Sequence, residues 1–104
     1  MSNTPISEQW HSAALKHADL EAAASMLEEN KSAVLSQSMT KLGDIPVSRA
    51  ELIVKASADW AEYIRKMCEA RTAANKARVE MEYLRMRAME WQSHEATART
   101  QARL

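Results

Sequence analysis

The chain has 104 residues, and its 14 basic and 14 acidic side chains give a formal net charge of zero. It contains one Gly, two Pro, three Trp, two Tyr and no Phe. So few turn-forming residues, among many strong helix formers, exclude a sheet-rich fold and predict a few long helices. The single Cys excludes an internal disulfide framework. The first 47 residues are mildly acidic and the others mildly basic, which suits packing of the two halves at least as well as binding of a polyanion.

The first predicted helix covers about residues 6–42. It follows Pro5, which is tolerated in a first helical turn. Gly43 provides the residue of left-handed backbone conformation that commonly ends a helix, and Pro46 prevents the helix from continuing. We therefore expect a turn at residues 43–47.

The second predicted helix covers about residues 49–100, with no Gly or Pro inside it. Ser48 and Glu51 have the spacing of a capping box, in which each side chain satisfies a free backbone amide of the other residue. Val47 and Leu52 have the spacing of the accompanying hydrophobic staple. These signals indicate that the second helix begins immediately after the turn.

Each predicted helix carries a ladder of apolar and small residues whose steps alternate between three and four. On the second helix the ladder runs from Ile53 to Ala102, and only Glu95 interrupts it. Such a 3.5-residue repeat is typical of a coiled-coil seam. The predicted seam residues are Trp10, His17, Leu20, Leu27, Ile53, Trp60, Met67, Ala74, Met81 and Leu84.

Folding the chain back at the turn brings the two ladders into register. Seam positions then face seam positions, with Trp10 opposite Met81, His17 opposite Ala74, Ala24 opposite Met67, Lys31 opposite Trp60 and Ser38 opposite Ile53. The fold class is therefore all-α, with a single antiparallel helical hairpin over residues 1–104. Because further apolar residues lie off the seam, we expect the hairpin to form a dimeric four-helix bundle or a larger helical oligomer.

Motifs for catalysis or metal binding are not found. Glu8 and His11 have the E-x-x-H spacing of di-iron helical bundles, but the second such pair that these sites need is missing. His17 is interpreted as a seam histidine with a local hydrogen bond, and Cys68 as a small buried residue. We therefore expect no enzymatic activity, no metal and no cofactor.

Two features bear on location. No apolar run is as long as a membrane-spanning helix requires, and the opening residues MSNTPISEQ lack the basic and apolar regions of a signal peptide. We expect no membrane association and a cytoplasmic location.

The second helix is predicted to extend past the first by residues 85–104, roughly 30 Å. Met, Trp and Arg residues gather there and at its root, and these types commonly anchor protein interfaces. The predicted partner-binding residues are Tyr83, Arg85, Met86, Arg87, Met89, Trp91, Arg99 and Arg103. The occupant is either another copy of the chain or a different macromolecule.

The last third of the chain resembles the ends of short α-helical accessory proteins encoded by bacteriophages and prophages. The resemblance is carried by Tyr83, Leu84, Arg85, Met86, Arg87, Glu90, Trp91 and Gln92. It implies a small non-enzymatic protein in a bacterial host, with no defined active site.

Two functions remain open at this point. The first is a protein–protein interaction module, an adaptor or inhibitor that binds a host or phage protein. The alternative is a nucleic-acid-binding accessory protein in phage DNA recombination or replication, in which basic residues contact phosphates and Tyr83 or Trp91 stacks on bases. The basic residues of this alternative are Arg71, Lys76, Arg78, Arg85, Arg87, Arg99 and Arg103.

Overall fold

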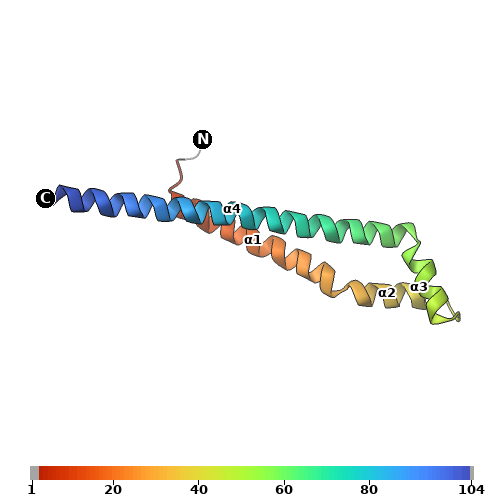
Figure 1. The fold of residues 1–104 in the computed structure, drawn as a ribbon. Coiled ribbons are helices and arrows are strands. Elements are labelled where there is room, and N and C mark those ends of the chain that lie inside the picture. The colour runs from red at the N-terminus through yellow and green to blue at the C-terminus, as the bar shows by residue number, and fades with distance from the viewer. Residues whose placement is uncertain (1–2, 104) are drawn as a thin grey trace.

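The structure is a computed structural model that describes residues 3–103. Within this range it contains helices α1 (Ile6–Glu29), α2 (Lys31–Thr40), α3 (Val47–Lys55) and α4 (Ala58–Ala102) and no strand. The molecule is a thin rod whose principal extents are 83 × 24 × 15 Å (Figure 1). The expected all-α fold class is confirmed.

Helix α1 lies antiparallel against the middle of α4 and forms a helical hairpin with it (Figure 1). The hydroxyl of Tyr63 on α4 donates a hydrogen bond to the carbonyl of Leu27 on α1. Ala24 and Ala74, one on each helix, are both completely buried. The contact of Tyr63 with Leu27 agrees with the register expected from the two ladders at this end of the hairpin, and the small alanine side chains allow the helix axes to approach closely.

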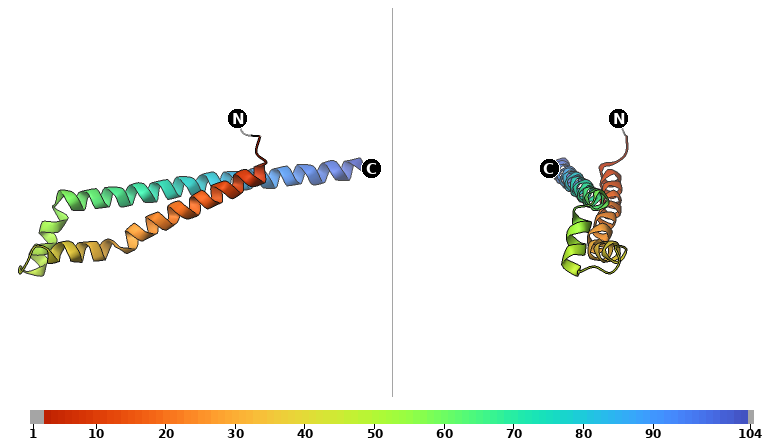
Figure 2. Two further views of the ribbon diagram at one scale, coloured as in Figure 1. Left: turned by 180° about the vertical axis from the view of Figure 1, so that it is seen from behind. Right: turned by 90° about the vertical axis from the view of Figure 1, so that its right-hand side faces the viewer.

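The expected single helix over residues 6–42 is wrong, because the structure divides it at Asn30. Helix α1 ends at Glu29, α2 begins at Lys31, and the two helices run in different directions (Figure 2). Asn is a poor helix former, because its side chain competes for backbone hydrogen bonds. Beside it, the carbonyl of Leu27 accepts from Tyr63. The chain therefore bends where the cost of interrupting the helix is low.

The turn between α2 and α3 partly matches the expected residues 43–47. Gly43 has φ +89°, the left-handed conformation predicted for it, and its N–H donates to the carbonyl of Thr40 at 3.2 Å. Pro46 precedes α3 with an extended backbone, and the helix begins at Val47. The helix therefore starts two residues before the predicted position.

That early start removes the predicted capping box. Ser48 lies inside the first turn of α3 and does not cap it, while Glu51 forms an ion pair with Lys55 at 2.7 Å. The predicted hydrophobic staple is also wrong, because Val47 and Leu52 are each 72% exposed. The physical reason is Pro46, whose fixed φ already suits the residue before a helix.

The expected single helix over residues 49–100 is likewise divided. Helix α3 ends at Lys55 and α4 begins at Ala58, and Ser57 between them has an extended backbone. The Ser57 hydroxyl accepts a hydrogen bond from the backbone N–H of Trp60 at 3.2 Å and donates one to the carbonyl of Val54 at 2.6 Å. Ser57 is therefore the N-cap of α4. At this break α3 crosses from α2 to α4 (Figures 1 and 2).

The core of the hairpin is thin. The buried side chains within residues 3–103 are mostly small, namely Ala24, Ala50, Val54, Trp60, Ala74, Ala77, Leu84 and Ala88. All predicted seam residues are buried or half-buried except Ile53, which is 43% exposed because it lies on α3 rather than on a continuous second helix. The seam therefore packs along α1 and α4 and is lost at the helix breaks.

Candidate functional site

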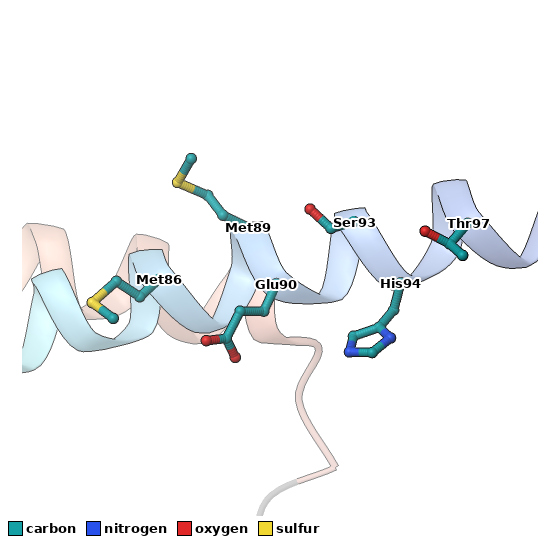
Figure 3. Close-up of a pocket in the computed structure, with 6 residues that line it drawn as sticks. All are labelled: Met86, Met89, Glu90, Ser93, His94 and Thr97. Carbon is teal, nitrogen blue, oxygen red and sulfur yellow. The ribbon is translucent and has the colours of Figure 1, made fainter.

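The candidate site is the outward face of α4 near its C-terminal end. Two rows of residues, each spaced by four, lie next to each other on this face (Figure 3). Side chains spaced by four in a helix lie on one face, one turn apart. The rows are Met86, Glu90 and His94, and Met89, Ser93 and Thr97. We call these six residues the outer stripe.

The outer stripe is an open helix surface rather than an enclosed cavity. Met86 and Met89 are 58% and 54% exposed, although both have large apolar side chains. Tyr83, one turn before them, is 49% exposed. The stripe therefore offers apolar contact area to a partner surface, and it lacks the concave walls that bury a small molecule.

The structure exposes all eight predicted partner-binding residues but does not bring them onto one face. Trp91 lies on the inner side of α4, where it lines a small hollow with Pro5, Ile6 and Ser7 at the start of α1. Arg99 lies further along α4, and Arg103 is the C-cap of that helix. The predicted partner-binding residues therefore fall into three separate places. One set lies on or next to the outer stripe, Trp91 lies beside α1, and Arg99 and Arg103 lie at the C-terminal end.

The start of α1 lies beside Ala88 to Gln92, so α1 reaches further along α4 than predicted. The unpaired end of α4, with its C-cap Arg103, is residues 93–103, roughly 17 Å at 1.5 Å per residue. Each of these residues is exposed. We call residues 93–103 the projection. The sequence had predicted a longer overhang of residues 85–104, so that prediction is corrected. Residue 104 lies outside the described residues.

Arg85 and Arg87 interact with neighbours on their own helix. The guanidinium of Arg87 donates to the Tyr83 hydroxyl at 2.9 Å and lies 5.8 Å from the centre of the Tyr83 ring. This hydrogen bond raises the pKa of Arg87 above its ordinary value, with a smaller effect from the charge of Glu90. Arg85 lies 3.7 Å from a carboxylate oxygen of Glu82. Both cations therefore have local electrostatic partners.

Arg71 joins the two long helices. Its guanidinium makes a two-pronged contact with Glu28 at 2.7 and 2.8 Å and contacts Glu21 at 2.5 Å. The hydrogen bond from Arg71 is the largest cause of the lowered pKa of the Glu28 carboxyl. Arg71 therefore joins α1 to α4 through its contacts with Glu28 and Glu21. In the sequence, this contact between the helices was indicated by the excess of acidic residues in the first 47 positions and of basic residues in the others.

A second open region lies at the other end of the hairpin, between α2, α3 and the start of α4. It has a volume of about 320 Å³ and was not expected from the sequence, because continuous helices would leave no such space. Trp60 and Tyr63 are stacked there, with ring centres 5.8 Å apart. We call it the open end. It is lined by Val34, Ser38, Lys41, Leu42, Ile53, Val54, Ser57, Asp59, Trp60 and Tyr63.

The side chains that could take part in catalysis or metal binding do not lie close together. Across residues 3–103, no three His, Cys, Asp or Glu side chains are grouped as a metal site would need. His17 is half-buried on the seam, but it makes no hydrogen bond within the described residues, so the predicted local hydrogen bond is absent. Cys68 is exposed, and the prediction of a buried thiol is wrong. Cys68 lies on the side of α4 away from α1, because the seam follows the neighbouring positions Met67 and Ala70. No helix in the described range is long and apolar enough to cross a membrane.

The chain matches no protein-family model, no curated protein and no solved structure.

Proposed function

We propose that this protein is a non-enzymatic, phage-type accessory protein that works as a protein–protein interaction module, as an adaptor or inhibitor of a host or phage protein in the bacterial cytoplasm. In this proposal it acts as a homo-oligomeric helical bundle, and the outer stripe of α4 binds the partner. The observation that carries the proposal is the exposure of Tyr83, Met86 and Met89 on one helix.

The chemistry of the outer stripe favours a protein partner. Methionine side chains are flexible and adapt to irregular apolar surfaces, and an exposed helix face with apolar residues at helical spacing fits a groove of another protein. Glu90 and His94 add polar groups within the same row as Met86. These groups can fix the orientation of the partner while the methionines provide the buried area.

Local partners of three of the seven basic residues disfavour nucleic acid as the main ligand, while Lys76, Arg78, Arg99 and Arg103 make no ion pair within residues 3–103. Arg71 is held by two glutamates, Arg85 lies near Glu82, and Arg87 contacts Tyr83. A surface that binds phosphates requires cations whose charge is available to the phosphate backbone. Nucleic-acid binding is therefore treated as an outcome of the test below.

The test is affinity capture from a bacterial host lysate with the full chain and two double variants. Met86→Ala/Met89→Ala removes the apolar part of the outer stripe, and we expect it to abolish capture of a specific protein. Leu15→Ala/Met26→Ala is the matched control, because these residues are 56% and 63% exposed on α1. The control is expected to capture the same protein as the unmodified chain.

Equal capture by both double variants would contradict the proposal. A parallel titration of labelled single-stranded DNA at low and moderate salt examines the alternative. Binding that weakens steeply with salt would replace the protein-binding proposal with the nucleic-acid one.

A further inference from the structure

The hairpin is incomplete at both of its ends (Figures 1 and 2). At one end the projection is a single helix that no other described element covers. At the opposite end, α2 and α4 diverge, and the open end lies between them. Ile53 and Leu42 in the open end are 43% and 39% exposed, and the alanines of the projection are exposed as well.

The surface area of the chain shows how much packing is missing. The accessible surface is 8130 Å², whereas a compact monomer of this mass has about 5,900 Å². The radius of gyration is 23.0 Å, against about 13 Å for a compact domain of this length. Two chains together carry roughly 4,500 Å² of excess surface, within the range of about 2,000–5,000 Å² buried in large homodimer interfaces.

The two incomplete ends are similar in length. The projection is roughly 17 Å long, and α2, which contributes Val34 and Ser38 to the open end, spans roughly 15 Å. On the inner side of α4, the seam continues into the projection through the small residues Ala98 and Ala102. Small residues allow a helix to approach closely the apolar lining of the open end, which includes Val34 and Trp60.

The charges of the two ends are also complementary. Glu95 interrupts the apolar seam of the projection, and within residues 3–103 it makes no ion pair. Lys41 lines the open end and, in the same range, has no ion pair either. When the ends of two antiparallel rods are aligned, Glu95 of one chain approaches Lys41 of the other. Arg103, at the end of the projection, then approaches Asp44 in the turn.

From these observations we propose that a second copy of this chain completes the hairpin. The two copies lie antiparallel about a two-fold axis, and the projection of each copy packs into the open end of the other. Such an interface is isologous and closed, so that it produces a dimer and not a filament. The proposal rests on the homo-oligomer of the proposed function and names its geometry, and it leaves the outer stripe exposed on the opposite side of α4.

A charge exchange in the full chain tests the contact between the two ends. Glu95→Lys and Lys41→Glu each place like charges together, and we expect each to weaken the dimer at least roughly tenfold in sedimentation equilibrium. The double variant Glu95→Lys/Lys41→Glu restores the opposite charges and is expected to recover most of the affinity. Glu90→Lys, on the outer stripe, is the matched control and should leave dimerisation unchanged. Additive weakening in the double variant would overturn the assigned contact.

Cross-linking tests the antiparallel arrangement. In a Cys68→Ser background, Ser38→Cys combined with Ala98→Cys is treated with a short bis-maleimide. The two positions lie at opposite ends of a rod 83 Å long, so only a bridge between chains can join them. We expect a covalent dimer from the pair and none from Ala98→Cys alone.

A covalent dimer from Ala98→Cys alone would indicate parallel chains and overturn the arrangement. A monomer at every concentration would overturn the dimer itself. Neither result depends on capture of a partner by the outer stripe, so failure of this inference is distinguishable from failure of partner binding.

Discussion

The hydroxyl of Tyr63 donates a hydrogen bond of 2.5 Å to the carbonyl of Leu27, 36 positions earlier in the chain. Leu27 lies in the last turn of α1, where backbone carbonyls lack partners within the helix. The ring of Tyr63 also stacks on Trp60. A single side chain therefore joins the end of α1 to the first turns of α4, at the point where the hairpin begins to open.

Tyr63→Phe is expected to lower the free energy of unfolding by about 1 kcal/mol, because it removes one intramolecular hydrogen bond and leaves a partly buried carbonyl unsatisfied. Tyr83→Phe is the matched control. Its hydroxyl contacts only the exposed Arg87 of the same helix, and we expect a change within about 0.5 kcal/mol. Urea denaturation followed by circular dichroism measures both, and equal effects would contradict the role given to Tyr63.

Ser57→Ala is expected to destabilise the protein by about 1 kcal/mol, because it removes the N-cap hydrogen bond to the amide of Trp60. Ser48→Ala is expected to have almost no effect, since Ser48 does not cap α3. Thermal unfolding of the two variants distinguishes the observed cap from the one predicted from sequence. A larger loss for Ser48→Ala would show that the second helical segment begins at the predicted capping box.

Arg71→Gln is expected to lower the Tm by a few degrees, because it removes the ion pairs between α1 and α4. Arg65→Gln removes ion pairs with Glu62 and Glu69 that lie within α4, and it should have a smaller effect. Both losses should decrease at high salt, since the pairs are partly exposed. An equal loss of Tm in the two variants would show that Arg71 gains no additional stabilising role from joining two helices.

The contribution of Arg71 should also depend on pH. Its hydrogen bond lowers the folded-state pKa of Glu28 below the ordinary value. A carboxyl with a lowered folded pKa gives stability that is fully present above about pH 5 and is lost as the pH falls through the folded pKa. The Tm difference between the unmodified chain and Arg71→Gln should therefore be constant near neutral pH and should decrease toward zero as the solution becomes acidic. A difference that grows in acid would contradict this assignment.

Gly43→Ala should lower the free energy of unfolding by about 1 kcal/mol, because an L-residue is strained at φ +89°. Nothing lies within 4 Å of the added Cβ, so a steric clash does not contribute. Gly43→Asn should cost less, since Asn tolerates the left-handed region better than Ala. Chemical denaturation gives both values, and an Ala variant as stable as the unmodified chain would show that the turn relaxes.

Several parts of the fold could be predicted from the sequence. The all-helical class follows from the near absence of Gly and Pro, and the hairpin follows from two seams that meet across one turn. The burial of Ala24 and Ala74 agrees with the predicted seam. The contact of Tyr63 with Leu27 agrees with the predicted register near the turn, whereas the start of α1 lies further along α4 than that register placed it. Periodicity is informative here because only one face of each long helix can be buried against the other.

The candidate site could be predicted only in part. The sequence indicated the Met- and Arg-containing end of the second helix, and the structure separates Met86 and Met89 on the outer stripe from Trp91 beside α1. The open end was not predicted, because it depends on both helix breaks. Ser57, which precedes Ala58 and Asp59, is a recognisable N-cap signal. The apolar ladder continues from Ile53 through Trp60 without a break, so the spacing predicted one continuous helix there.

The amino-acid sequence by itself determined that this chain forms helices, where it reverses direction, and which residues form the seam, because helix propensity, turn residues and apolar spacing are local properties. The tertiary structure alone decided that Tyr63 satisfies the carbonyl of Leu27 beside the bend at Asn30, that Arg71 joins α1 to α4, and that the two ends of the hairpin differ in shape. These outcomes depend on which groups from distant parts of the chain satisfy an unpaired carbonyl or carboxylate, and local spacing contains no information about that choice.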